Sequence, residues 1–171
     1  MADSNHVAIV DGKSEPSPKA LIAEIEQRRV RWRALVERGS KAPTEPGVAG
    51  DWSLRDVVAH INAYLRFHVS NLGGRARPLG EMPEAIGFDT ERRNTWMHEQ
   101  DLGLSWPFVR TEGEQLHEEL LAQLRTRSPE QFRAQLVDWH PWPTWRWMCD
   151  IRDHYDQHEP GLKLWLDDTK E

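Results

Sequence analysis

The sequence predicts an all-α protein, a four-helix bundle with one long crossover between the second and third helices. Apolar residues recur at helical spacing in four long segments, and residues suited to capping stand before several of them. No segment alternates apolar and polar residues convincingly, as a half-buried strand would. Four helices joined by one long connection bury their apolar faces most economically as a bundle.

The first two helices are predicted at about residues 19–38 and 53–72. Apolar residues of the first helix form one stripe, namely Leu21, Ile22, Ile25, Val30, Trp32, Leu35 and Val36. Residues 39–50 are rich in proline and glycine, which indicates a loop. Ser53 is the predicted N-cap of the second helix, because Asp56 follows three residues later as an acidic capping box. Gly73 and Gly74 end this helix.

The third helix is predicted after an irregular crossing over residues 75–88, where prolines and glycines interrupt any helical pattern. It begins near Asp89 or Thr90 and is interrupted at Gly103 and Pro107. Ser105 is placed to cap its continuation, which runs to about residue 125.

The last third of the chain carries a short predicted helix at 128–132 and an aromatic, proline-broken loop at 139–143. The fourth long helix is predicted from about Thr144 to Asp167.

Composition limits the classes of function. Residues 1–18 are polar and aperiodic, so we predict a flexible N-terminal leader before a single domain over residues 19–171. A formal net charge of −6 without a basic stripe speaks against direct contact with nucleic acid. No apolar run approaches the roughly 20 residues of a membrane span, and no signal-peptide pattern opens the chain, so we expect a cytoplasmic protein with no membrane partner. The lone Cys149 suits a reducing compartment.

Three histidines form the strongest chemical signal. His154 and His158 are one helical turn apart on the predicted fourth helix, and His60 lies on the apolar face of the second. Burying three imidazoles is costly unless they hydrogen-bond or share a cation, and neutral imidazole is a ligand for several first-row metals. The pattern therefore predicts a divalent metal, such as zinc, nickel, iron or manganese. Three protein ligands leave one position open, as in catalytic sites.

The simpler interpretation is that this spacing arose by chance. A pair of histidines four residues apart is unremarkable in a chain with eight histidines, and such side chains are usually solvated. The position of His60 on a second inward stripe, directly after a capped helix start, favours the metal site.

The segment 50–61, Gly-Asp-Trp-Ser-Leu-Arg-Asp-Val-Val-Ala-His-Ile, resembles the opening of helix two in the DinB-like (DinB/YfiT) superfamily. The ending His154-Tyr155-Asp156-Gln157-His158, with Leu162 and Trp165 beyond it, is similar to the last-helix motif of that superfamily. The resemblance covers about residues 21–166. It implies an up-up-down-down helical bundle with a divalent metal on His60, His154 and His158.

The segment Arg93-Asn94-Thr95-Trp96 also resembles a stretch of the ClbS/DfsB-like branch. The superfamily resemblance implies two kinds of activity. Some members are transferases and isomerases that use a low-molecular-weight thiol (mycothiol, bacillithiol or glutathione), which the metal activates. ClbS-like members protect cells from genotoxic natural products by opening a strained ring.

Further site residues are predicted around the histidines. Asp150 and Tyr64, each one turn from a predicted ligand, are candidate catalytic groups, although a surface carboxylate and a core tyrosine are equally good interpretations. Arg93 and Asn94 are predicted to face the same cavity and bind substrate. Among the clustered tryptophans, Trp139 and Trp142 are predicted to stack on a planar substrate, whereas Trp145 and Trp147 suit packing equally well. The other histidines expected to be solvated are His68, His98, His117 and His140.

The predicted activity is metal-assisted activation of water or a thiol, followed by attack on an electrophilic small molecule, aromatic or with a strained ring. This makes the protein a hydrolase or a thiol-dependent transferase. Two alternatives stay open: a binding protein that sequesters a toxic compound, and a self-resistance protein for a DNA-damaging metabolite, either without metal catalysis. The sequence leaves monomer and homodimer open.

Overall fold

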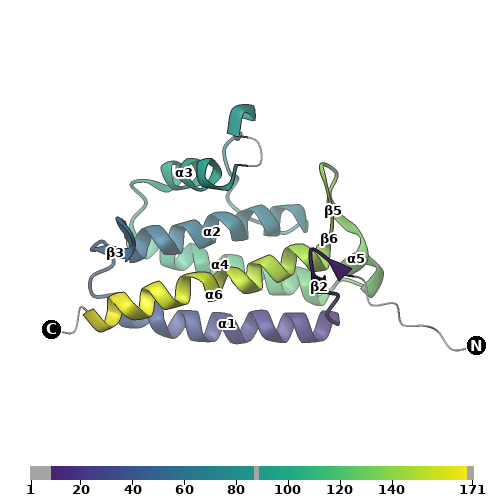
Figure 1. Cartoon of the computed structure of the whole chain (residues 1–171), viewed down its shortest axis with the longest axis horizontal. Helices are drawn as coiled ribbons and strands as arrows, with labels where there is room; N and C mark the ends of the chain where they lie inside the picture. Colours follow the sequence, from purple (N-terminus) through teal and green to yellow (C-terminus); the bar gives the residue numbers. More distant parts are fainter. Residues whose placement is uncertain (1–8, 87–88, 169–171) are drawn as a thin grey trace, which may run out of the picture.

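The computed structural model describes residues 9–86 and 89–168, and most of these residues are helical (Figure 1). This mostly helical content confirms the predicted all-α class. The helices are α1 (Pro18–Gly39), α2 (Leu54–Asn71), α3 (Thr90–Asp101), α4 (Trp106–Arg125), α5 (Pro129–Arg133) and α6 (Thr144–Asp168), with a 3₁₀ turn η1 (Glu84–Ile86). The strands are β1 (Ile9–Val10), β2 (Lys13–Ser14), β3 (Pro46–Ala49), β4 (Trp52–Ser53), β5 (Gln135–Val137) and β6 (His140–Pro143).

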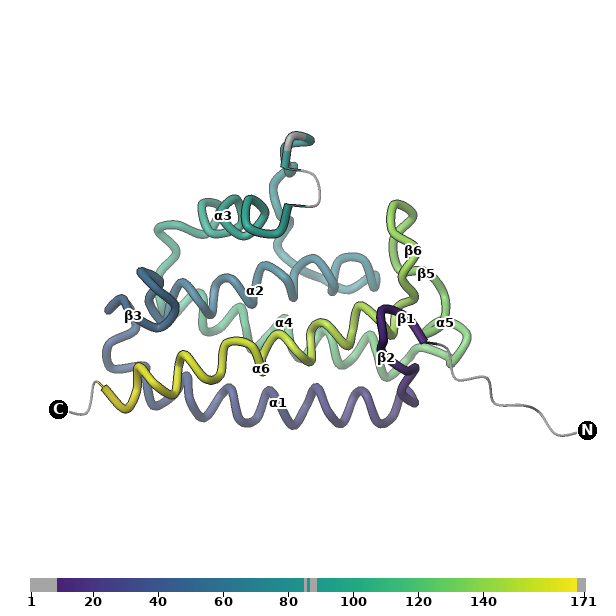
Figure 2. The backbone as a smooth tube through the Cα atoms, viewed as in Figure 1, coloured from purple at the N-terminus to yellow at the C-terminus, as the bar shows by residue number. Residues whose placement is uncertain are grey.

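The four long helices α1, α2, α4 and α6 lie side by side (Figure 2). Cross-helix ion pairs give the direction of α1 relative to α6: Glu24 pairs with Arg152 and Arg38 with Asp167, so the two helices run parallel. At one end, the Leu54 side chain at the start of α2 packs on the C-terminal residue of α1, which places α2 antiparallel to α1.

Helices α2 and α4 also run parallel to each other. Asn62 Nδ2 donates to the Val109 carbonyl, and one turn further on Arg66 pairs with Glu112. The order of directions is therefore up, down, down, up, and the expected up-up-down-down order is wrong. Its physical cause is the short connection over residues 40–53, which returns the chain along α1, whereas the longer segment 72–105 carries it back to the starting end of α2.

The predicted interrupted third helix consists of two separate helices, α3 and α4. Gly103 adopts a φ of +85° at the break, and Asp89 and Ser105 are the N-caps of the two helices, as predicted. Helix α3 packs outside the four long helices, against α2 (Figure 1). Consequently α3 covers part of one face of α2 instead of extending the third long helix.

The start of α2 follows the predicted capping box. Asp56 N donates to Ser53 Oγ at 3.3 Å, and Ser53 N donates to the Asp56 carboxylate at 3.0 Å. Beyond Leu72, Gly73 has a φ of +86°, which ends the helix where the sequence indicated. This local chemistry sets the starting point of the helix that carries His60.

Part of the predicted flexible leader, residues 9–14, forms a hairpin, while residues 1–8 lie outside the described ranges. Strands β1 and β2 form a hairpin whose turn residues Asp11 and Gly12 both have positive φ, 48° and 72°. Such a turn joins two antiparallel strands without splaying them. Val10 packs against the core, and Lys13 pairs with Asp153 of α6. The hairpin therefore covers the start of α6.

Strands also appear elsewhere, contrary to the expectation of none. β3 pairs with β4 before α2, and β5 pairs with β6, which lies in the segment predicted as an aromatic loop. The β5–β6 hairpin stands beside the start of α6 (Figure 2). Each ladder holds only two short strands, so helix packing still forms the core.

Three buried charges and the half-buried Arg77 tie the crossing segment to the long helices. The Arg66 guanidinium, fully buried, donates to Glu112 of α4 at 2.9 Å and to Asp101, the last residue of α3, at 2.6 Å. Arg77 of the crossing segment bonds to the same two carboxylates. This cluster holds α3 and residues around 77 in place over α2 and α4.

Among the described helices, none combines the length and the apolar character that crossing a membrane requires.

Candidate metal centre

The three predicted metal ligands come together in space. His60 Nε2 lies 3.0 Å from His154 Nε2, and His158 Nε2 lies 3.1 Å from the same atom. One ring nitrogen from each residue falls within 4.8 Å of the others. The cluster therefore joins α2 to α6 across 94 residues of sequence.

The positions of the three histidines on α2 and α6 direct their side chains toward each other. His60 follows Val57 by three residues and precedes the buried Ile61, so the apolar face of α2 carries it inward. On α6, the spacing of four residues stacks His154 and His158 on one face, while the intervening Tyr155 points to another. The antiparallel approach of α2 and α6 then brings the two faces together.

Burial keeps these imidazoles uncharged. His60 is 4% exposed, and burial, assisted by neighbouring imidazoles, lowers its pKa to about 3. The same causes lower the pKa of His154 to about 2, and burial lowers the pKa of His158. Neutral imidazoles keep their lone pairs, which is the state that a metal ion requires of its ligands.

The geometry fits a first-row cation. Two imidazole nitrogens at tetrahedral angles around zinc, each about 2.0–2.1 Å from the ion, would lie about 3.3 Å apart. The observed separations of 3.0 and 3.1 Å are close to this value. His60 Nδ1 is buried and has no hydrogen-bond partner among the described residues, so no outer carboxylate or carbonyl orients this ring.

The histidines line an open pocket of about 540 Å³. Its walls come from α2, α3, α6, the end of β3 and the start of β4. The lining residues are Ala49, Trp52, His60, Tyr64, His68, Thr90, Asn94, Asp150, Ile151, His154, Gln157 and His158. A pocket of this volume accommodates a small organic molecule beside the histidine cluster.

Tyr64 and Asn94 meet in this pocket, as the sequence predicted. The Tyr64 hydroxyl donates to Asn94 Oδ1 at 2.8 Å, which links α2 to α3. The Tyr64 ring packs edge-on against His60 and His154. Arg93 is not among the pocket residues; its guanidinium carbon lies over the Tyr64 ring, 5.9 Å from the centroid.

Asp150 also lines the pocket, but its carboxylate is engaged elsewhere. Its Oδ1 accepts a hydrogen bond from Arg146 at 2.6 Å. In the described part of the chain no hydrogen bond joins it to His154, so the predicted orienting contact is not formed. Its place in the wall leaves it one turn from the histidine cluster.

The prediction that Trp139 and Trp142 wall the pocket is wrong, since neither lines it. Both lie in the β5–β6 hairpin and pack against Trp147 of α6. Arg146 stacks on Trp142, with 4.0 Å between the guanidinium carbon and the ring centroid. In this cluster Trp142 is half-buried, whereas Trp139 remains 54% exposed. The aromatic wall of the pocket is Trp52 instead, which packs on His60 and stacks on His98.

Two histidines expected to be solvated are buried. His68, 2% exposed, lies two turns beyond His60 on the same face of α2 and lines the pocket. Its spacing of eight residues from His60 was the available signal. His117, 1% exposed, lies in the core, where its Nδ1 is 3.2 Å from the Tyr155 hydroxyl.

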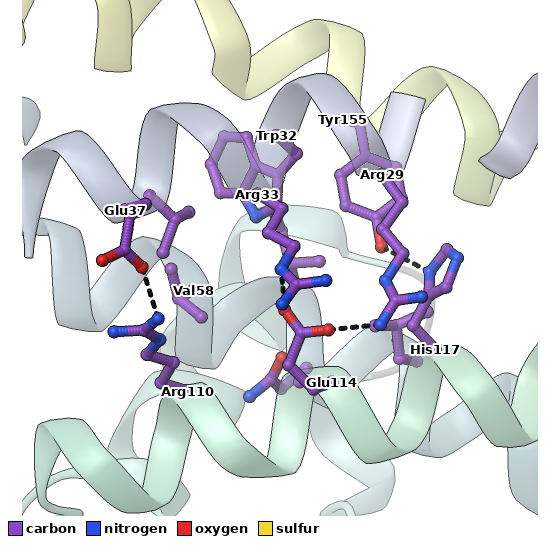
Figure 3. Close-up of a pocket in the computed structure, with 14 residues that line it drawn as sticks. Arg29, Trp32, Arg33, Glu37, Val58, Arg110, Glu114, His117 and Tyr155 are labelled. Atoms are coloured by element: carbon purple, nitrogen blue, oxygen red, sulfur yellow. Dashed lines mark hydrogen bonds and ion pairs between the residues drawn. The ribbon is translucent and has the colours of Figure 1, made fainter. Parts of the chain in front are cut away.

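His117 belongs to a second, much smaller pocket of about 40 Å³, between α1, α2 and α4 (Figure 3). Arg29 and Glu114 pair at its edge, as do Arg110 and Glu37. The volume suits a water molecule rather than an organic ligand. This pocket is separate from the histidine cluster, because Tyr155 points away from its neighbour His154.

Burial of His117 predicts an acid-sensitive contribution to stability. Burial, and then the charges of Arg29 and Arg125, lowers its pKa to about 3; Tyr155 and Glu114 also face the site. Its folded pKa lies below the unfolded value, so the unfolded chain alone takes up a proton as pH falls below about 6.5. We expect His117 to cost about 2 kcal/mol between pH 7 and 5, measured by urea unfolding of the wild type and His117→Phe. A difference between the two proteins that stays the same at both pH values would contradict this.

The Tyr64–Asn94 bond predicts how firmly α3 is held. Tyr64→Phe removes one neutral hydrogen bond, so we expect α3 to open more easily by about 1 kcal/mol. Hydrogen exchange of the α3 amides should accelerate about fivefold, while exchange in α4 stays unchanged. Equal exchange in α3 of both proteins would show that other contacts hold the helix.

Comparison of the chain with known protein families, with curated proteins and with solved structures finds no match.

Proposed function

We propose that this protein is a metal-dependent enzyme that activates water or a low-molecular-weight thiol for attack on an electrophilic small molecule. The observation that carries the proposal is the convergence of three neutral imidazoles, His60, His154 and His158, on the wall of an open pocket. A divalent cation held there would act as a Lewis acid and lower the pKa of the nucleophile.

The other pocket residues have separate tasks in this proposal. The Tyr64 hydroxyl is positioned by its hydrogen bond to Asn94. When a substrate oxygen replaces Asn94 as the acceptor, the hydroxyl donates to the substrate. Asp150 accepts the proton released by the nucleophile, since it lines the same wall one turn from His154. Trp52 offers a flat face next to His60 for an aromatic or planar group.

We further propose that the four long helices form a bundle of the DinB-like kind, with the up-down-down-up order of directions in place of the order expected from the sequence. Support comes from the placement of the motif histidines on the second and last long helices, and from the long connection between the parallel α2 and α4. The thiol-dependent and hydrolytic activities implied by that resemblance both need an open position beside three histidines.

A second candidate is a ClbS-like self-resistance protein that opens or sequesters a genotoxic compound without metal catalysis. The observation in its favour is the pocket volume of about 540 Å³, which exceeds what a metal and water require. The two candidates differ in what the histidines contribute to activity.

The test is turnover by metal-loaded and chelator-treated protein. Suitable substrates are p-nitrophenyl acetate, for attack by water, and 1-chloro-2,4-dinitrobenzene, for attack by glutathione or bacillithiol. We expect activity with bound metal and a loss of at least about a hundredfold after chelation or in His60→Ala. His98→Ala is the matched control, because this imidazole stacks on Trp52 without joining the cluster. Turnover that persists without metal in His60→Ala would support the second candidate.

A further inference from the structure

The metal-binding end of the pocket is continuous with a second polar end at His68. Helices α2 and α6 run antiparallel, so moving from His60 to His68 along one wall corresponds to moving from His158 to Asp150 along the other. Two helical turns separate His60 from His68, which is about 12 Å along the axis. The pocket is therefore an elongated groove with different chemistry at its two ends.

The His68 imidazole packs among aromatic rings and makes no hydrogen bond to the described part of the chain. Its ring packs against Phe67 and Trp147, with centroid distances of 5.0 and 5.7 Å. Nδ1 is fully enclosed and has no partner among the described residues. Because the ring also lines the pocket, Nε2 is the nitrogen that a bound molecule can reach.

An imidazole in this state carries a free-energy cost in the unliganded protein. Burying a polar nitrogen without a hydrogen bond costs about 1–3 kcal/mol. This cost stays with Nδ1, which a ligand does not reach, so the use of a histidine here lies with Nε2, which a molecule in the pocket can hydrogen-bond. A purely structural residue at this position would be better served by leucine or phenylalanine among the same aromatic neighbours.

We propose that His68 is a specificity-determining residue that hydrogen-bonds an uncharged polar group, such as a carboxamide, at the far end of an elongated substrate. The inference rests on the proposed function, because the reacting end of that substrate would lie at the histidine cluster. A carboxamide both donates and accepts, so it satisfies either tautomer of a neutral imidazole.

The chemistry of this end of the pocket explains the preference for an uncharged group. Burial lowers the pKa of His68 to about 3, so the ring carries no charge with which to balance an anion. A cation would have to shed water beside Phe67 and Trp147, and the nearby Asp150 is already paired with Arg146. A neutral amide avoids both costs.

The test uses metal-anchored probes on the zinc-loaded protein, with binding measured by calorimetry. Acetohydroxamic acid reports the metal site alone. Two longer hydroxamic acids carry a chain of about six methylene groups, roughly the span of two helical turns. One ends in a carboxamide and the other in an isopropyl group of the same shape, so their comparison isolates the hydrogen bond.

We expect the wild type to bind the carboxamide probe about tenfold more tightly than the isopropyl probe. His68→Phe should abolish this preference and leave the affinity for acetohydroxamic acid unchanged. His68→Gln keeps a neutral hydrogen-bonding group and should retain part of the preference. This variant also tests the role of His68 if His68→Phe fails to fold. His117→Phe, a second buried histidine outside the pocket, should retain all of it.

The outcomes separate the two proposals. If acetohydroxamic acid does not bind the zinc-treated wild type, the proposed metal function fails, and the role of His68 fails with it. If acetohydroxamic acid binds but the wild type does not prefer the carboxamide, or if His68→Phe keeps the preference, the role of His68 alone is overturned.

Discussion

Replacing His154 by alanine is expected to abolish metal binding. His154 Nε2 is the central atom of the cluster, 3.0 Å from His60 Nε2 and 3.1 Å from His158 Nε2. Its loss leaves two ligands and an enlarged gap between them. We expect zinc affinity to fall by well over a hundredfold, beyond the roughly 10- to 100-fold effect of losing an outer-shell partner.

The measurement is metal content per chain by elemental analysis after dialysis, followed by zinc titration. The wild type should hold about one equivalent and His154→Ala close to none. His98→Ala should match the wild type, which shows that the loss belongs to the cluster and not to histidine content. Similar zinc affinity in His154→Ala and the wild type would disprove the three-histidine site.

The largest expected effect on stability comes from Arg66→Met. The guanidinium is fully buried and bonds to Asp101 and Glu112, whose side chains are 2% and 9% exposed. Removing one partner of a buried ion pair costs about 3–5 kcal/mol, because the remaining charges lose their compensation. Arg77 still contacts both carboxylates, so we expect a loss near the lower end of this range, about 3 kcal/mol.

Urea unfolding monitored by circular dichroism measures this change. The matched control is Arg92→Met, since Arg92 is 69% exposed and pairs with Asp89 three residues away on the surface. Its effect should stay within about 0.5 kcal/mol. If Arg66→Met is as stable as the control, the buried cluster contributes little to holding α3 and the crossing segment.

Local sequence signals located most helices correctly. Ser53 with Asp56 marked the start of α2, Ser105 marked the start of α4, and glycine at 73 ended α2, because capping chemistry acts within a few residues. The hairpin at residues 9–14 was missed, although Asp11-Gly12 is a turn signal, because the flanking strands have only two residues each.

The content of the pocket was only partly predictable. His60, His154, His158, Tyr64, Asn94 and Asp150 all line it as expected. Trp139 and Trp142 do not, because the β5–β6 pairing turns them toward Trp147. His68 and His117 were expected to be solvated but are buried. A polar residue type suggests exposure to solvent, whereas the neighbours on other helices decide whether the side chain is buried.

By itself, the sequence determined the helical class, the helix boundaries and the faces on which the candidate ligands stand, since these depend on periodicity and capping over a few turns. The tertiary structure alone decided the up-down-down-up order, the placement of α3 over α2 and the second polar end of the pocket at His68. These features depend on contacts between residues tens of positions apart, such as Arg66 with Asp101 and His60 with His154, which no local pattern encodes.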